Sequence, residues 1–151
     1  MTYVKRNTVN VYLHLVWATY QRNPLIAETM EPDVYRCIEN TCLKMGCQVL
    51  AIGGMPDHMH LAISYPTTIT IAQLMQQVKG VSSTFIRNRV EKGEFFGWQE
   101  GYGVFSFAQK QCDSVINYIH NQKSHHSANK LWSSVENIEA MSYSLPSGTD
   151  G

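Results

Sequence analysis

The chain of 151 residues is 44% apolar and 11% aromatic, which is enough for one globular domain with its own hydrophobic core. Its 12 basic and 12 acidic residues cancel, so no overall charge attracts nucleic acid and any such contact must come from a local patch. The apolar stretch near the N-terminus is too short to cross a bilayer and lacks a signal-peptide cleavage pattern, so we expect a cytoplasmic protein with no membrane partner.

The first half of the chain predicts a strand, a helix and a β-hairpin, in that order. Residues 9–17 alternate in the pattern of a half-buried strand, with one face formed by Val9, Val11, Leu13, Leu15 and Trp17. Between Pro32 and Gly46, apolar residues recur every three or four positions, which is typical of a helix. Two β-rich runs at 47–54 and 58–65 are separated by a turn with the sequence Gly-Gly-Met-Pro-Asp, which predicts a hairpin.

The second half of the chain predicts further helices around a short strand. Helical spacing covers residues 70–79 and 81–90, with an interruption at Gly80. A short strand follows at 103–108. The last helix covers 113–126, with a predicted N-cap at Asp113 or Ser114.

This order of elements predicts an α+β fold. We expect a ferredoxin-like βαββαβ antiparallel sheet with helices on one face and an appended C-terminal helix. Residues 1–130 are expected to form a single domain. Residues 131–151 end in a polar segment rich in Ser, Gly and Pro, so we expect a poorly ordered C-terminal tail.

Two histidines lie one residue apart in the second strand of the predicted hairpin. His58 and His60 therefore point to the same side of an extended chain, with Cα atoms roughly 7 Å apart, and can hold one ion between them. A strand histidine is more often a hydrogen-bonded core or surface residue. The pair by itself leaves both interpretations open.

The last predicted helix carries a second polar pair. Tyr118 and Gln122 are four residues apart, so they share one helix face, and the helix is anchored to the core by Val115, Ile116 and Ile119. An amphipathic-helix tyrosine with its hydroxyl in water is the common alternative for Tyr118.

Four short motifs occur in a recognisable order along the chain. They are PDHMHL at 56–61, KGVSS at 79–83, WQEGYG at 98–103 and YIHNQ at 118–122. Over residues 9 to 126, this pattern resembles the single-tyrosine HUH transposases of the insertion-sequence-200 type, including their relatives that mobilise repetitive extragenic palindromes. Each motif is weak alone, and the four together are specific.

The resemblance implies a chemistry and a set of residues for it. Tyr118 matches the catalytic nucleophile, which forms a 5′-phosphotyrosine bond with single-stranded DNA next to a hairpin. His58, His60 and Gln122 match the ligands of a divalent metal, Mg²⁺ or Mn²⁺, and Met59 matches the hydrophobic residue between the histidines. The family also implies a homodimer, in which we expect the Tyr118 helix of one subunit to reach the histidine strand of the other. A self-contained site, which the palindrome-mobilising relatives imply, is the alternative.

Other residues are candidates for DNA contacts or for support of the site. Positive charges and aromatic rings around the middle motifs, together with one hydroxyl, are possible DNA-binding groups: Lys79, Ser82, Arg87, Trp98 and Tyr102. For Lys79 and Arg87, a charged side chain in water on the helix surface is an equally common alternative. For Trp98, packing in the core is at least as common as DNA binding. Asp57, which precedes the histidine pair, is expected to serve the turn more than to bind metal.

Two other functions use the same residues. One is a domesticated or inactive domain that binds single-stranded DNA hairpins without cutting them. The other is a metal-dependent hydrolase in which the His-x-His pair holds the metal and water is the nucleophile. A covalent adduct between DNA and tyrosine distinguishes the DNA strand transferase from both alternatives.

Overall fold

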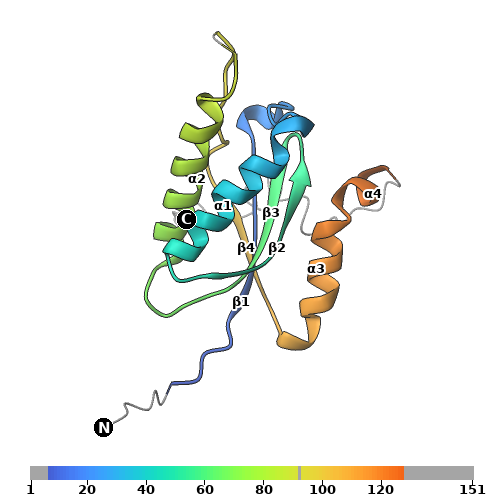
Figure 1. Ribbon diagram of the computed structural model, residues 1–151. Coiled ribbons are helices and arrows are strands. Elements are labelled where there is room, and N and C mark those ends of the chain that lie inside the picture. The colour runs from blue at the N-terminus through green and yellow to red at the C-terminus, as the bar shows by residue number, and fades with distance from the viewer. Residues whose placement is uncertain (1–6, 92, 128–151) are drawn as a thin grey trace, which may run out of the picture.

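The structure is a computed structural model that describes residues 7–91 and 93–127. Its sheet has four antiparallel strands in the order β2-β3-β1-β4, visible at the centre of Figure 1. The strands are β1 (Tyr12–Ala18), β2 (Gln48–Met55), β3 (His58–Ser64) and β4 (Gly103–Phe107). With the helices between them, they form the predicted ferredoxin-like βαββαβ arrangement.

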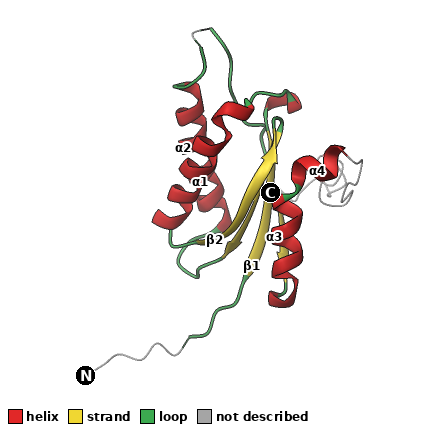
Figure 2. Ribbon diagram, turned by 45° about the vertical axis from the view of Figure 1, so that its right-hand side comes forward, coloured by secondary structure: helices red, strands yellow, loops and turns green. Residues whose placement is uncertain are grey.

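Two long helices cover one face of the sheet, as Figures 1 and 2 show. Helix α1 (Glu31–Lys44) begins with Pro32 and acidic residues in its first turn, and the chain leaves it through Gly46 at φ 85°. Helix α2 (Ile71–Arg87) begins with a capping box, in which Thr70 and Gln73 satisfy each other's backbone N–H groups. The main core lies between these helices and the sheet, and includes Leu13, Leu15, Trp17, Ile38, Met59, Leu61, Ile63, Leu74 and Val78.

Helix α3 (Cys112–His120) packs on the opposite face of the sheet (Figure 2). Its buried residues form a second apolar cluster with two strand alanines: Ala51, Ala62, Val115, Tyr118 and Ile119. Strand β1 is therefore buried on both faces, since His14 and Val16 are buried like Leu13 and Leu15 on the other face. The prediction of a half-buried strand is wrong here because α3 covers the face expected to meet solvent.

Two predictions are wrong: the interruption of a helix at Gly80 and the placement of Gly53 and Gly54 in a turn. Helix α2 continues through Gly80 without interruption. Gly53 and Gly54 belong to β2 rather than to the turn, since Met55 pairs with His58 in the sheet. A Cβ atom on Gly53 would lie 2.5 Å from the backbone oxygen of Ile119 in α3, so this glycine permits the close approach of helix and strand.

The C-terminal part of the described chain also differs from expectation. A short 3₁₀ helix, Gln109–Gln111, runs directly into α3, which begins at Cys112 and has no side-chain cap at Asp113 or Ser114. The helix ends at His120, and a separate helix, α4, spans Gln122–Ser127. The predicted tail at 131–151 lies outside the described residues.

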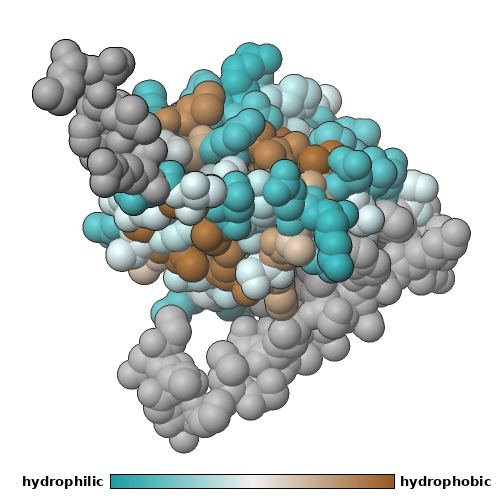
Figure 3. Space-filling model, turned by 90° about the horizontal axis from the view of Figure 1, so that it is seen from below, coloured by the Kyte–Doolittle hydropathy of each residue, from teal (hydrophilic) through white to brown (hydrophobic). Residues whose placement is uncertain are grey.

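Two further 3₁₀ helices, Tyr20–Arg22 and Glu28–Met30, lie between β1 and α1. No helix in the described ranges 7–91 and 93–127 is both long and apolar enough to span a membrane. In the view from below in Figure 3, apolar residues on the surface are interspersed with polar ones.

Candidate active site

Strand β3 presents its two histidines to the face covered by α3. Met59 points the other way and is 1% exposed in the main core, as the alternation of a strand requires. His58 and His60 are 2% and 0% exposed, and their ring centroids lie 5.0 Å apart. The histidines are therefore neighbours in the interface between sheet and helix.

Helix α3 brings Tyr118 against these rings. The centroid of the Tyr118 ring lies 5.6 Å from that of His60, in an edge-on contact, and the residue is 3% exposed. The neighbouring Ile119 makes the close approach to Gly53 on β2. The absence of a side chain at Gly53 thus helps determine how near the tyrosine comes to the histidine strand.

Gln122 lies beside Tyr118, but not on the same helix as the sequence predicts. Asn121 leaves the helical conformation, with φ −102° and ψ 23°, and Gln122 is the first residue of α4. Gln122 is 2% exposed, and its Nε2 donates to the backbone oxygen of Tyr118 at 3.3 Å. Its Oε1 is buried and accepts no hydrogen bond within the described part of the chain.

His14 is a member of the cluster that sequence reasoning did not select. Its Nε2 and Nδ1 of His60 share a hydrogen bond of 2.9 Å, and its ring centroid lies 6.2 Å from that of Tyr118. A single histidine in the otherwise apolar strand VYLHLVW was the available signal. That signal is weak because a buried histidine usually serves packing.

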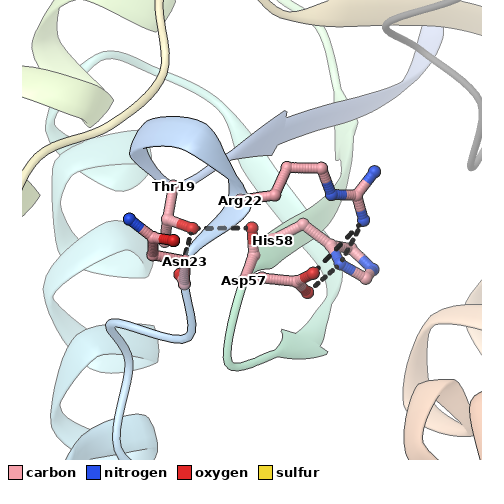
Figure 4. A network of polar contacts seen from close by, with 5 residues as sticks. All are labelled: Thr19, Arg22, Asn23, Asp57 and His58. Atoms are coloured by element: carbon pink, nitrogen blue, oxygen red, sulfur yellow. Dashed lines mark hydrogen bonds and ion pairs between the residues drawn. The ribbon is translucent and has the colours of Figure 1, made fainter.

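A polar network supports His58 from the turn before it (Figure 4). The Asp57 carboxylate accepts a hydrogen bond from Nδ1 of His58 at 2.7 Å and pairs with Arg22 at 3.5 Å. Burial raises the pKa of the Asp57 carboxyl, but the hydrogen bond from His58 and the charge of Arg22 help to outweigh it and hold the pKa below its ordinary value. Asp57 thus remains a carboxylate that orients His58, a role beyond the expected turn chemistry.

The backbone near Arg22 is held in an uncommon conformation. Gln21 and Arg22 have φ of 53° and 55°, in the left-handed region that costs free energy for residues other than glycine. Thr19 holds the segment, because its hydroxyl donates to the backbone oxygens of Asn23 at 2.6 Å and Asp57 at 3.1 Å. This conformation directs the Arg22 guanidinium toward Asp57 and His58 (Figure 4).

His58, His60 and Gln122 carry a mixed set of nitrogen and oxygen donors, of the kind that binds divalent cations. Among the described residues, no group of three His, Cys, Asp or Glu side chains is arranged to hold a metal. The two imidazoles and the buried amide oxygen of Gln122 would supply three neutral donors to such a cation, which would provide Lewis-acid chemistry at a phosphate.

The candidate DNA-binding residues are divided between interior and surface. The Lys79 ammonium donates to the backbone oxygens of Gln99 and Gly101 at 2.8 and 3.0 Å. Desolvation lowers its pKa, and the charge of Glu100 opposes that shift. Ser82 is fully buried and accepts a hydrogen bond from Nε1 of Trp98 at 3.0 Å.

These contacts attach α2 to the loop before β4, so Lys79, Ser82 and Trp98 hold structure together in this arrangement. Arg87 is exposed and Tyr102 is half-buried. A DNA contact by these two residues stays a prediction.

A cavity lies beside the cluster, between β4 and α3. Its volume is about 330 Å³, and its walls include His14, Phe105, Phe107, Gln111 and Ser114. It therefore connects the buried imidazole of His14 with the molecular surface. Space for a substrate group exists next to the tyrosine helix.

Comparisons with known proteins identify relatives of this fold. The family described as "Transposase IS200 like" matches residues 7–122. The chain is 24% identical over 114 residues to the ISDra2 transposase TnpA of Deinococcus radiodurans, an alignment that covers 72% of this chain and 81% of that protein.

Two solved structures share the architecture. One is a protein from Deinococcus radiodurans R1 assigned as a transposase, with a TM-score of 0.64, 20% identity, and coverage of 81% of this chain and 98% of the other. The second is a REP-associated tyrosine transposase bound to a REP hairpin, with a TM-score of 0.60, 14% identity, and coverage of 83% and 74%. At these identities the structures show a common fold.

Proposed function

Because the chain belongs to the family of IS200-like transposases, we propose that it cleaves and rejoins single-stranded DNA beside hairpins, with Tyr118 as the nucleophile. The observation that carries this proposal is the edge contact of the Tyr118 ring with His60, at 5.6 Å between centroids. It joins the nucleophile and the histidine pair in one buried cluster. The hairpin-bound relative of the same fold supports a hairpin as the DNA form that is bound.

The proposed reaction exchanges one phosphate ester for another. The Tyr118 hydroxyl oxygen attacks phosphorus and forms a phosphotyrosine bond, while the bond from phosphorus to the 3′ oxygen breaks. The tyrosine loses its proton and the departing 3′ oxygen gains one, so a free 3′-hydroxyl is released. Because the ester energy is kept in the phosphotyrosine, a second 3′-hydroxyl can reverse the step without ATP.

The residues around Tyr118 would assist in distinct ways. An unperturbed tyrosine has a pKa near about 10, so attack at neutral pH requires help with its proton or with the charge on phosphate. His58, His60 and Gln122 would hold Mg²⁺ or Mn²⁺, and Lewis-acid polarisation of the scissile phosphate is the chemistry such an ion supplies. Asp57 keeps His58 in place by accepting a hydrogen bond from its Nδ1, and Arg22 holds the Asp57 carboxylate through an ion pair.

The covalent intermediate provides the test. The protein is incubated with Mg²⁺ and a 5′- and 3′-labelled single-stranded oligonucleotide that carries the flanking hairpin. We expect label to remain on denatured wild-type protein, and Tyr118→Phe to abolish the adduct while it still binds the oligonucleotide. Tyr20→Phe is the matched control, since Tyr20 is 43% exposed and lies outside the cluster.

Each alternative has its own outcome in this experiment. Binding by the wild type without cleavage favours the inactive hairpin-binding domain. Cleavage without any adduct favours the hydrolase with water as nucleophile. Adduct formation that persists in Tyr118→Phe would show that another residue attacks.

A further inference from the structure

His14 occupies a defined position relative to His60 in the sheet. In the antiparallel pairing of β1 with β3, Val16 lies opposite His60 and His14 lies opposite Ala62. His14 and His60 are therefore diagonal neighbours on one face, the face that α3 covers, at a spacing that long side chains can bridge.

The two imidazoles make direct contact in the interior. Nε2 of His14 lies 2.9 Å from Nδ1 of His60, and the residues are 2% and 0% exposed. The His14 ring is held on its sides by Phe105 of β4, at 6.4 Å between centroids, and by Tyr118 of α3, at 6.2 Å. The contact between the two imidazoles is therefore buried where the sheet meets α3.

The same atom, Nδ1, is engaged in both histidines of β3. Asp57 bonds Nδ1 of His58 at 2.7 Å, and His14 bonds Nδ1 of His60. In both rings the other nitrogen, Nε2, is buried in the cluster. Since Nδ1 of each ring is engaged by a neighbouring side chain, Nε2 is the ring nitrogen that would bind a metal.

We propose that His14 is a positioning residue that makes Nε2 of His60 the metal-binding nitrogen. A neutral imidazole that ligates through Nε2 carries its proton on Nδ1, and that N–H then donates to Nε2 of His14. The acceptor at His14 selects this tautomer and fixes the orientation of the His60 ring, as partners of ligating histidines do. This inference rests on the proposed metal-binding role of His58, His60 and Gln122.

Two substitutions of similar size separate hydrogen bonding from packing. Glutamine at position 14 offers an oxygen near the place of Nε2, whereas methionine fills similar space with only a weak acceptor. Affinity for Mn²⁺ alone is measured on the full chain without DNA, from the electron paramagnetic resonance signal of free Mn²⁺. We expect His14→Met to weaken binding by about 10- to 100-fold, and His14→Gln to retain most of the wild-type affinity.

Thermal unfolding in chelator shows whether each variant folds. Equal Mn²⁺ affinity in folded His14→Met and wild type would overturn the proposal, as would an equal loss in both folded variants. Wild-type protein that does not bind Mn²⁺ would overturn both the metal site and this role of His14. If the wild type forms the Tyr118 adduct but His14→Met does not change the affinity for Mn²⁺, the inference is overturned and the proposed function stands.

A measurement on the wild type is independent of variant folding. Long-range ¹H–¹⁵N nuclear magnetic resonance spectra of the histidine rings distinguish a proton on Nδ1 from one on Nε2. We expect His60 to be the Nδ1–H tautomer, with assignment by loss of its signals in His60→Ala. A proton on Nε2 of His60 would reject the proposed role of His14.

Discussion

At the scale of single residues, the candidate site depends on imidazoles that differ in their surroundings. His58 contacts a carboxylate and a guanidinium, whereas His60 contacts another imidazole and the tyrosine ring. By contrast, His120 at the end of α3 is exposed. Residue type alone therefore does not distinguish the proposed metal ligands from other histidines of the chain. Their burial and their hydrogen-bond partners do.

The metal requirement is tested by replacing one buried histidine. We expect His58→Ala to lower the rate of adduct formation by about 100-fold or more, because it removes one of three protein donors. Excess chelator should have a similar effect on the wild type, and readdition of Mg²⁺ or Mn²⁺ should restore activity. His120→Ala, a change of the same residue type on the surface, should retain the wild-type rate. Full activity of the wild type in excess chelator would contradict a metal-dependent mechanism.

At the scale of elements, two packing arrangements position the site. The contact of α3 with the sheet depends on a glycine of β2, where a Cβ would approach the Ile119 oxygen to 2.5 Å. On the other face, Lys79 and Ser82 attach α2 to the loop before β4 through Gln99, Gly101 and Trp98. Gln99 in turn donates its backbone N–H to Ala18, at the end of β1.

Two glycine-to-alanine substitutions should act in opposite directions. Gly53→Ala forces α3 from the sheet and should lower the free energy of unfolding by about 1–3 kcal/mol, with loss of adduct formation because Tyr118 moves with the helix. Gly80→Ala adds a methyl group with no atom within 4 Å, and should raise the free energy of unfolding by about 0.5–1 kcal/mol because alanine favours the helix. Chemical denaturation measures both. Stability unchanged in Gly53→Ala would show that α3 does not need this close approach.

At the scale of the whole molecule, the tyrosine helix lies on the sheet of its own chain. Val115 and Ile119 pack on Ala51 and Ala62, and Lys123 of α4 pairs with Glu31 of α1 at 2.8 Å. Exchange of α3 to a partner subunit would require this pair to break and the apolar cluster to open. The contact of Tyr118 with His60 within one chain favours a self-contained site, and the shared site of a homodimer stays a prediction.

Subunit mixing distinguishes the two arrangements. Tyr118→Phe and His60→Ala are each expected to be inactive, and the two proteins are combined under conditions of verified subunit exchange. A self-contained site keeps one lesion in every chain, so we expect no recovery of cleavage. Sites shared across a twofold dimer would give a mixed dimer one intact site, and roughly a quarter of all sites would function. Recovery at that level would contradict the self-contained site.

The order of elements was predictable from sequence because it depends on local periodicity. The two-residue alternation of β1 and β3 and the helical spacing of α1 and α2 are short-range patterns, and their order along the chain indicated the ferredoxin-like fold. The placement of His58 and His60 on one face, with Met59 in the core, follows from the same alternation. The spacing from Tyr118 to Gln122 also predicted that they are near one another, although Asn121 divides them between two helices.

Only the tertiary structure decided which other side chains join this cluster. His14 is 46 residues from His60, and Arg22 is 35 residues from Asp57. Their meeting depends on strand pairing and on a left-handed backbone segment, neither of which has a local sequence pattern. In the sequence, Gly53 resembled a turn glycine. Glycine is needed there because the Ile119 backbone approaches closely, and Ile119 belongs to a helix far along the chain. Local periodicity thus determined the elements of this protein, while contacts between distant segments decided how the elements enclose Tyr118.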